Sequence, residues 1–134
     1  MDASTVLAYV LREAHTRAVA AFLEALADSD RLFAPGLLLA ECTSVLRRKV
    51  HGRILTDEEA ATALEVALSL PITTVLEVEQ HRLAMTFSAR RNKSRAYDEH
   101  YLAVAALSGT EIVTIDGGMY QGAVEMGIPA RLLR

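Results

Sequence analysis

Four acidic residues stand where this chain is expected to pass from one structural element to the next. Asp2 precedes an apolar helical pattern, Glu41 lies in the helix after a short strand, Asp98 lies in the first turn of a helix, and Asp116 follows the strand pattern EIVTI. In open parallel sheets, functional side chains gather beyond the carboxyl ends of the strands. Converging carboxylates repel one another, and Mg²⁺ or Mn²⁺, which prefer oxygen ligands, would relieve that repulsion.

Two polar residues and a basic run accompany the acids. Ser4 follows Asp2 by two positions, and Thr114 precedes Asp116 by two, which places Thr114 on the same side of the expected strand. A cluster of cationic side chains comes just before Asp98, and it is expected to hold the phosphates of a polyanion. Its members are Arg90, Arg91, Lys93 and Arg95.

Each of these residues also has a plainer interpretation. Asp2 alone could be a helix N-cap, Asp98 a first-turn acid favoured by the helix dipole, and Asp116 a turn residue. Cationic side chains are common at helix ends for reasons of solubility. Cys42 is the only cysteine, so no zinc cluster or internal disulfide is expected, and a reducing compartment is favoured.

Hydrophobic periodicity predicts strands that alternate with helices. The segment TDEE predicts a capping box in which Thr56 caps a helix and Glu59 reaches back to it. No short hairpin turns occur, so the strands are expected to pair in parallel through helical crossovers. The predicted helices cover residues 5–14, 16–27, 35–50, 57–70, 78–91, 96–107 and 117–126, and the predicted strands 31–34, 72–76, 111–115 and 128–133.

The fold class that follows is α/β, a three-layer α/β/α sandwich around a central, mostly parallel sheet. The length of 134 residues and the 51% apolar content suit a single domain over residues 1–134. The net charge of −3 gives no global attraction to nucleic acid, so any polyanion must be held locally. The chain has neither a leader pattern nor an apolar run of membrane-spanning length, and a soluble cytoplasmic protein is expected.

The motifs occur in an order that resembles a PIN domain of the VapC toxin type. The segments are Asp2-Ala3-Ser4, Glu41 within LLLAECTSVLRR, the segment YDEHYLAVA around Asp98, and Thr114-Ile115-Asp116. Together they span almost the whole chain.

This resemblance implies a metal-dependent endoribonuclease that uses Mg²⁺ or Mn²⁺ and is restrained by a cognate antitoxin protein. Asp2, Glu41, Asp98 and Asp116 match the acidic, metal-holding positions of the family, and Ser4 and Thr114 match its supporting positions. Hydrolysis would then leave a 5′-phosphate and a 3′-hydroxyl. Apolar helices at both ends of the chain are consistent with a homodimer.

One departure from the family concerns the first strand, because only Met1 precedes Asp2. A shortened first strand would leave backbone groups of its neighbours unpaired. A catalytically impaired module that acts through protein binding is therefore the main alternative. A haloacid dehalogenase-like phosphatase would need an acid where Ser4 stands, and a response-regulator receiver would need a central aspartate and a late lysine that the sequence lacks.

Overall fold

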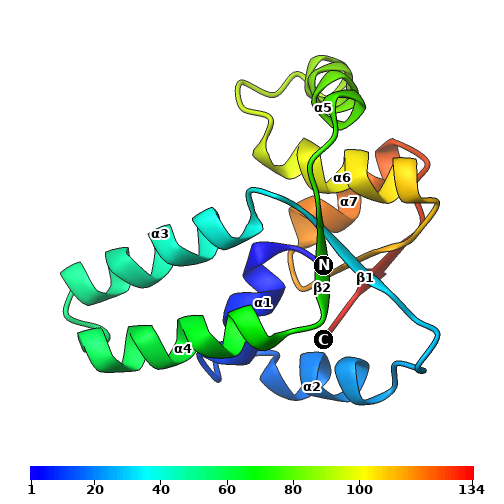
Figure 1. The fold of residues 1–134 in the computed structure, drawn as a ribbon. Helices are drawn as coiled ribbons and strands as arrows, with labels where there is room; N and C mark the ends of the chain where they lie inside the picture. Colours follow the sequence, from blue (N-terminus) through cyan, green and yellow to red (C-terminus); the bar gives the residue numbers. More distant parts are fainter.

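The structure is a computed structural model that describes residues 1–134, and it contains seven helices and four short strands (Figure 1). The helices are α1 (Ala3–Val10), α2 (Thr16–Glu24), α3 (Leu38–His51), α4 (Asp57–Ser69), α5 (Val78–Arg90), α6 (Tyr97–Ser108) and α7 (Gly117–Glu125). The strands are β1 (Leu32–Pro35), β2 (Ile72–Val75), β3 (Ile112–Thr114) and β4 (Ala130–Leu132).

The strands form two separate parallel pairs. β1 pairs with β2, with Leu32 opposite Ile72, and β3 pairs with β4, with Ile112 opposite Ala130. The α/β class and the parallel pairing agree with the sequence-based prediction. The single central sheet of a three-layer sandwich is not formed, because no strand lies between the two pairs.

The amino-terminal residues occupy the position between the two pairs. The Met1 ammonium donates a hydrogen bond to the Phe33 carbonyl of β1 at 3.1 Å. The chain enters α1 at Ala3, and the Thr5 hydroxyl accepts from the Ile115 backbone N–H, just after β3, at 3.1 Å. Residues 1–5 therefore bridge β1 and β3 mainly as the start of a helix.

The hydrophobic core surrounds α1, which lies at the centre of the molecule (Figure 1). Val6 of α1, Leu38 and Cys42 of α3, and Leu102 of α6 are each no more than 2% exposed and belong to one continuous cluster. This packing fixes the starts of α3 and α6 beside the start of α1. Three of the four candidate acids lie near those helix starts.

The α3–α4 pair projects from the rest of the molecule as a helical hairpin (Figure 1). The predicted capping box begins α4: the Thr56 hydroxyl accepts from the Glu59 N–H at 3.1 Å, and the Glu59 carboxylate accepts from the Thr56 N–H at 2.8 Å. None of the helices has the length and apolar character needed to cross a membrane.

Candidate active site

Asp2 is a buried carboxylate that caps α1. Its Oδ1 accepts from the Thr5 N–H at 3.4 Å and from the Thr5 hydroxyl, and its Oδ2 accepts from the Ser4 hydroxyl at 2.6 Å. Asp2 is 5% exposed, so these donors replace the water that a buried polar group loses. The Ser4 hydroxyl thus contacts Asp2, and Thr5 adds a second hydroxyl.

Glu41 projects from the first turn of α3 and is held by a residue of α6. The Tyr101 hydroxyl donates to Glu41 Oε2 at 2.5 Å. Burial raises the pKa of the Glu41 carboxyl, the Tyr101 hydrogen bond lowers it, and the Asp98 and Asp2 carboxylates raise it further. The Glu41 carboxylate is thus close enough to two other acids to feel their charge.

Asp98 lies in the first turn of α6 and reaches the surface. Partial burial raises the pKa of its carboxyl, and the Glu99 and Asp116 carboxylates add to that rise, whereas Lys93 and Arg91 oppose it. The Asp98 carboxylate therefore lies close enough to interact electrostatically with Glu41 of α3 and with Asp116 before α7.

Asp116 is exposed and caps α7 directly after β3. Its Oδ1 accepts from the Gly118 N–H at 2.6 Å and from the Met119 N–H at 2.9 Å. The Thr114 hydroxyl accepts from the Asp116 N–H at 2.9 Å, and Thr114 is fully buried. Thr114 therefore sets the backbone direction at Asp116, as expected for a supporting residue at the end of a strand.

The four acids surround one region from four helix starts, yet they do not form a closed chelate. Glu41 senses Asp98 and Asp2, and Asp98 senses Asp116. No group of three or more His, Cys, Asp or Glu side chains is arranged so that it could hold a metal ion. The donor set is nevertheless all-carboxylate, which suits an oxygen-preferring divalent cation. A cation would offset the mutual repulsion that, after burial, contributes to the raised pKa values of Glu41 and Asp98.

Arg91 departs from the role expected from the basic run. Its side chain is 7% exposed and donates to Glu99 Oε1 at 2.7 Å and to Glu125 Oε2 at 3.0 Å. These contacts turn the guanidinium inward, where it ties the end of α5 to α6 and α7. The surface portion of the run consists of Arg90, Lys93 and Arg95, which are exposed.

Two residues of the site were not predicted from the sequence. Thr5 is fully buried and connects the Asp2 carboxylate to the Ile115 N–H, while Tyr101 is 4% exposed and holds Glu41. Tyr101 lies three residues after Asp98 on α6, and therefore on the same side of the helix. The three-residue spacing from Asp98 is the sequence feature that could have indicated Tyr101 as a site residue. No sequence feature distinguishes Thr5 from a threonine of the core.

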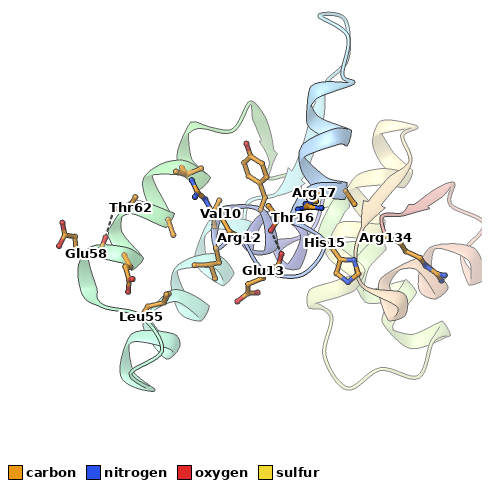
Figure 2. Close-up of a pocket in the computed structure, with 16 residues that line it drawn as sticks. Val10, Arg12, Glu13, His15, Thr16, Arg17, Leu55, Glu58, Thr62 and Arg134 are labelled. Carbon is orange, nitrogen blue, oxygen red and sulfur yellow. Dashed lines mark hydrogen bonds between the residues drawn. The ribbon is translucent and has the colours of Figure 1, made fainter.

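A groove lies elsewhere on the molecule (Figure 2). It has a volume of about 1160 Å³ and is lined by the end of α1, the start of α2, and α4. Its lining includes Leu55, Thr62 and Val66 in or just before α4, and Arg12 and Arg17 from the end of α1 and the start of α2. None of the four candidate acids lines it.

Comparison with known proteins gave one family. The search of curated proteins found no match to this chain. A family model of the PIN domain matches residues 1–124, a span that includes all four acids, Ser4 and Thr114. PIN domains are nuclease-type domains that generally use divalent metal ions, in keeping with an all-carboxylate cluster. Because the match covers most of its length, the chain belongs to the PIN domain family.

Proposed function

We propose that this protein is a metal-dependent endoribonuclease. The observation that carries the proposal is the grouping of Asp2, Glu41, Asp98 and Asp116 at four helix starts. There, burial first and the charges of other acids second raise the pKa of Glu41 and of Asp98. A cluster of carboxylates that oppose one another's ionisation is costly for folding, so it points to a functional use.

The four acids would hold Mg²⁺ or Mn²⁺. When bound, the cation would supply a low-pKa water and neutralise the scissile phosphodiester. The other residues of the site orient the acids: Ser4 and Thr5 fix Asp2, Tyr101 fixes Glu41, and Thr114 fixes the backbone at Asp116.

RNA would be held by exposed cations beside the acids. Lys93 lies close enough to Asp98 to lower the pKa of that carboxyl, and Arg90 and Arg95 are exposed on either side of Lys93 in sequence. Contacts from such residues are made to phosphates and depend little on sequence. Binding should therefore weaken steeply with salt. Cleavage should leave 5′-phosphates, as the resemblance to the VapC type implies.

We further propose that this nuclease is the toxin of a type II toxin–antitoxin pair, is homodimeric and acts in the cytoplasm. Membership of the PIN domain family supports a nuclease, and the acid cluster offers a surface that a basic antitoxin segment could cover. The exposed apolar side chains Leu76, Val78 and Met85 are candidates for the dimer contact.

The first test is thermal unfolding with and without Mn²⁺ or Mg²⁺. At about one hundred times its dissociation constant, a ligand that binds only the folded state adds roughly 2.7 kcal/mol to stability. The wild type should show a clear rise in melting temperature, and Asp98→Asn should show a much smaller one. The matched control is Asp28→Asn, which changes an exposed aspartate away from the acid cluster and should respond like the wild type.

Cleavage of a mixed-sequence RNA follows, with single-stranded DNA in parallel. Asp98→Asn should lower the metal-dependent rate by more than about tenfold, the lower bound expected when a metal site is perturbed. The proposal is contradicted if millimolar metal stabilises neither the wild type nor Asp28→Asn, or if Asp98→Asn cleaves RNA at the wild-type rate.

The second candidate function is a catalytically impaired PIN module that acts through protein binding. The observations that favour it are the separation of the sheet into two pairs and the lack of a preformed chelate among the acids. The same melting experiment separates the two candidates, because the binding module would show no metal shift.

A further inference from the structure

One aromatic ring is exposed beside the acids. The chain has three phenylalanines, four tyrosines and no tryptophan, and Tyr97 is the only exposed residue among them. Tyr97 is 58% exposed, whereas the others are buried or half-buried. A single exposed apolar side chain is ordinary on a protein surface, so the surroundings of Tyr97 decide what its ring can do.

Tyr97 begins α6 on the side of that helix that meets Glu41. Residues three and four positions apart are neighbours on a helix surface, so Asp98 and Tyr97 both lie next to Tyr101. The Tyr101 hydroxyl donates to Glu41 Oε2 at 2.5 Å, and this hydrogen bond identifies the side of α6 that faces α3. Tyr97 therefore lies one turn before Tyr101, at the rim of the acid cluster.

Cations border the ring on its other side. Helix side chains lean toward the amino end of their helix, so the Tyr97 ring leans toward the loop that enters α6. Lys93 and Arg95 of that loop are exposed, and Lys93 is close enough to Asp98 to lower the pKa of that carboxyl. Proteins that bind single-stranded nucleic acid combine these two features, because cations follow the phosphates while an aromatic ring accepts a base.

We propose that Tyr97 stacks on a base of the substrate, and that this substrate is single-stranded RNA with one base turned outward beside the scissile phosphate. This role rests on the proposed nuclease function, since the acids mark where that phosphate lies. Lys93 and Arg95 contact the phosphates next to the stacked base. Every base has a π face, so the contact selects an unpaired strand and not a sequence, whereas the bases of a duplex are already stacked on one another.

The Tyr97→Trp variant reports stacking directly, because the chain has no other tryptophan. A base stacked on the indole should quench its fluorescence. Titration with a mixed-sequence single-stranded RNA in low salt, first in EDTA and then with Ca²⁺ to neutralise the acids, should give a saturable loss of signal in at least one buffer. An abasic strand of the same length and charge should cause little quenching, and so should the RNA paired with its complement. The control is Leu68→Trp, an exposed position on α4 that should respond to none of these strands.

Cleavage kinetics in Mg²⁺ or Mn²⁺ test the same contact in the absence of a probe. Tyr97→Ala should raise the KM for single-stranded RNA by about five- to a hundredfold, the effect of losing one stacked base, and should change kcat much less. Tyr97→Phe keeps the ring and should restore most of that loss. Leu107→Ala, which removes an exposed apolar side chain from the other end of α6, is the matched control and should keep the wild-type KM. All three side chains are exposed, so the variants should melt close to the wild type.

Three results would each overturn the role of Tyr97. They are a wild-type KM for Tyr97→Ala, quenching of Tyr97→Trp that is absent in both buffers or equal for RNA and the abasic strand, and a fluorescence change that follows protein concentration without RNA. The last result would place the ring between two copies of the chain. Failure of the nuclease function is distinguishable, because then the wild type neither cleaves RNA nor gains stability from metal, while the quenching titration still reports whether a base stacks on this position.

Discussion

At the scale of single residues, the candidate acids have a structural role as well as a chemical one. Asp2 and Asp116 each cap a helix with Oδ1, and Asp2 also binds two hydroxyls. The cap interpretation and the active-site interpretation are therefore compatible. A capping carboxylate is held in one orientation by backbone N–H groups, which limits its motion.

Thr5→Val should weaken the fold through the loss of one hydroxyl. The variant keeps the shape of the side chain but leaves the Ile115 N–H unpaired and removes a donor from Asp2. We expect a loss of about 1–3 kcal/mol in the free energy of unfolding, measured by urea titration. Thr5→Ser, which keeps the hydroxyl, is the control, and equal losses in both variants would mean that the methyl group matters instead.

Tyr101→Phe should remove the hydrogen bond that holds the Glu41 carboxylate. The half-buried carboxylate would lose its donor, so stability should fall by about 1–3 kcal/mol. Because this hydrogen bond lowers the pKa of Glu41, its removal should raise that pKa and move the acid limb of the cleavage profile to higher pH. Tyr97→Phe, an exposed neighbour, should change neither quantity. An unshifted profile for Tyr101→Phe would show that Glu41 ionisation does not limit cleavage.

Asp98→Asn should be more stable than the wild type at neutral pH in the presence of EDTA. The pKa of Asp98 is raised in the folded state, so the folded protein binds this proton more tightly than the unfolded chain does. Stability from this group is present below the unfolded pKa and is lost as pH rises through the folded pKa. The melting temperature of Asp98→Asn minus that of the wild type should therefore increase between about pH 4 and pH 7. A constant difference would contradict the raised pKa.

At the scale of elements, Arg91 is the centre of the contacts between α5, α6 and α7. Its guanidinium pairs with Glu99 of α6 and Glu125 of α7, and Gly122 provides the space for it. Removing one partner of a buried ion pair is more costly than the pair is stabilising, because a charge is left without compensation. This cluster joins the first turn of α6, which carries Asp98, to the last turn of α7.

Gly122→Ala tests this cluster with a single methyl group. A Cβ on Gly122 would lie 2.5 Å from the Arg91 guanidinium, which two carboxylates hold in place. We expect a loss of about 1–3 kcal/mol in the free energy of unfolding, as for an overpacked core, despite the better helix propensity of alanine. Gly117→Ala is the matched control, since its Cβ would meet nothing within 4 Å. Equal stability of the two variants would show that Arg91 moves freely.

The elements themselves were predictable because their signals are local. Hydrophobic spacing placed all seven helices and four strands close to their observed positions, and the capping box at Thr56 was found from four consecutive residues. The inward direction of Arg91 was not predictable, because it depends on Glu125 and Gly122, which lie more than thirty positions away in the sequence. A basic run in the sequence does not reveal which cation has a buried partner.

At the scale of the whole molecule, the strands form two separate parallel pairs where one central sheet was predicted. Residues 1–5 bridge the two pairs, mainly as the start of α1. The four acids that were predicted to lie together stand at the starts of four helices. Helix packing around α1 is sufficient to bring the four helix starts together without a continuous sheet.

The buried thiol of Cys42 can report how often α3 separates from the core. The thiol is fully buried beside Glu41 in α3, and burial, followed by the charges of Glu41 and Asp2, raises its pKa to about 11. Thiol reagents need a thiolate that they can reach, whereas in the folded protein Cys42 is both buried and protonated at neutral pH. The labelling rate of this single cysteine, followed by mass spectrometry, will therefore measure how often α3 leaves the core. A cation bound at the acids should lower the labelling rate of Cys42 in proportion to its occupancy. Metal binding can therefore be measured without any RNA substrate.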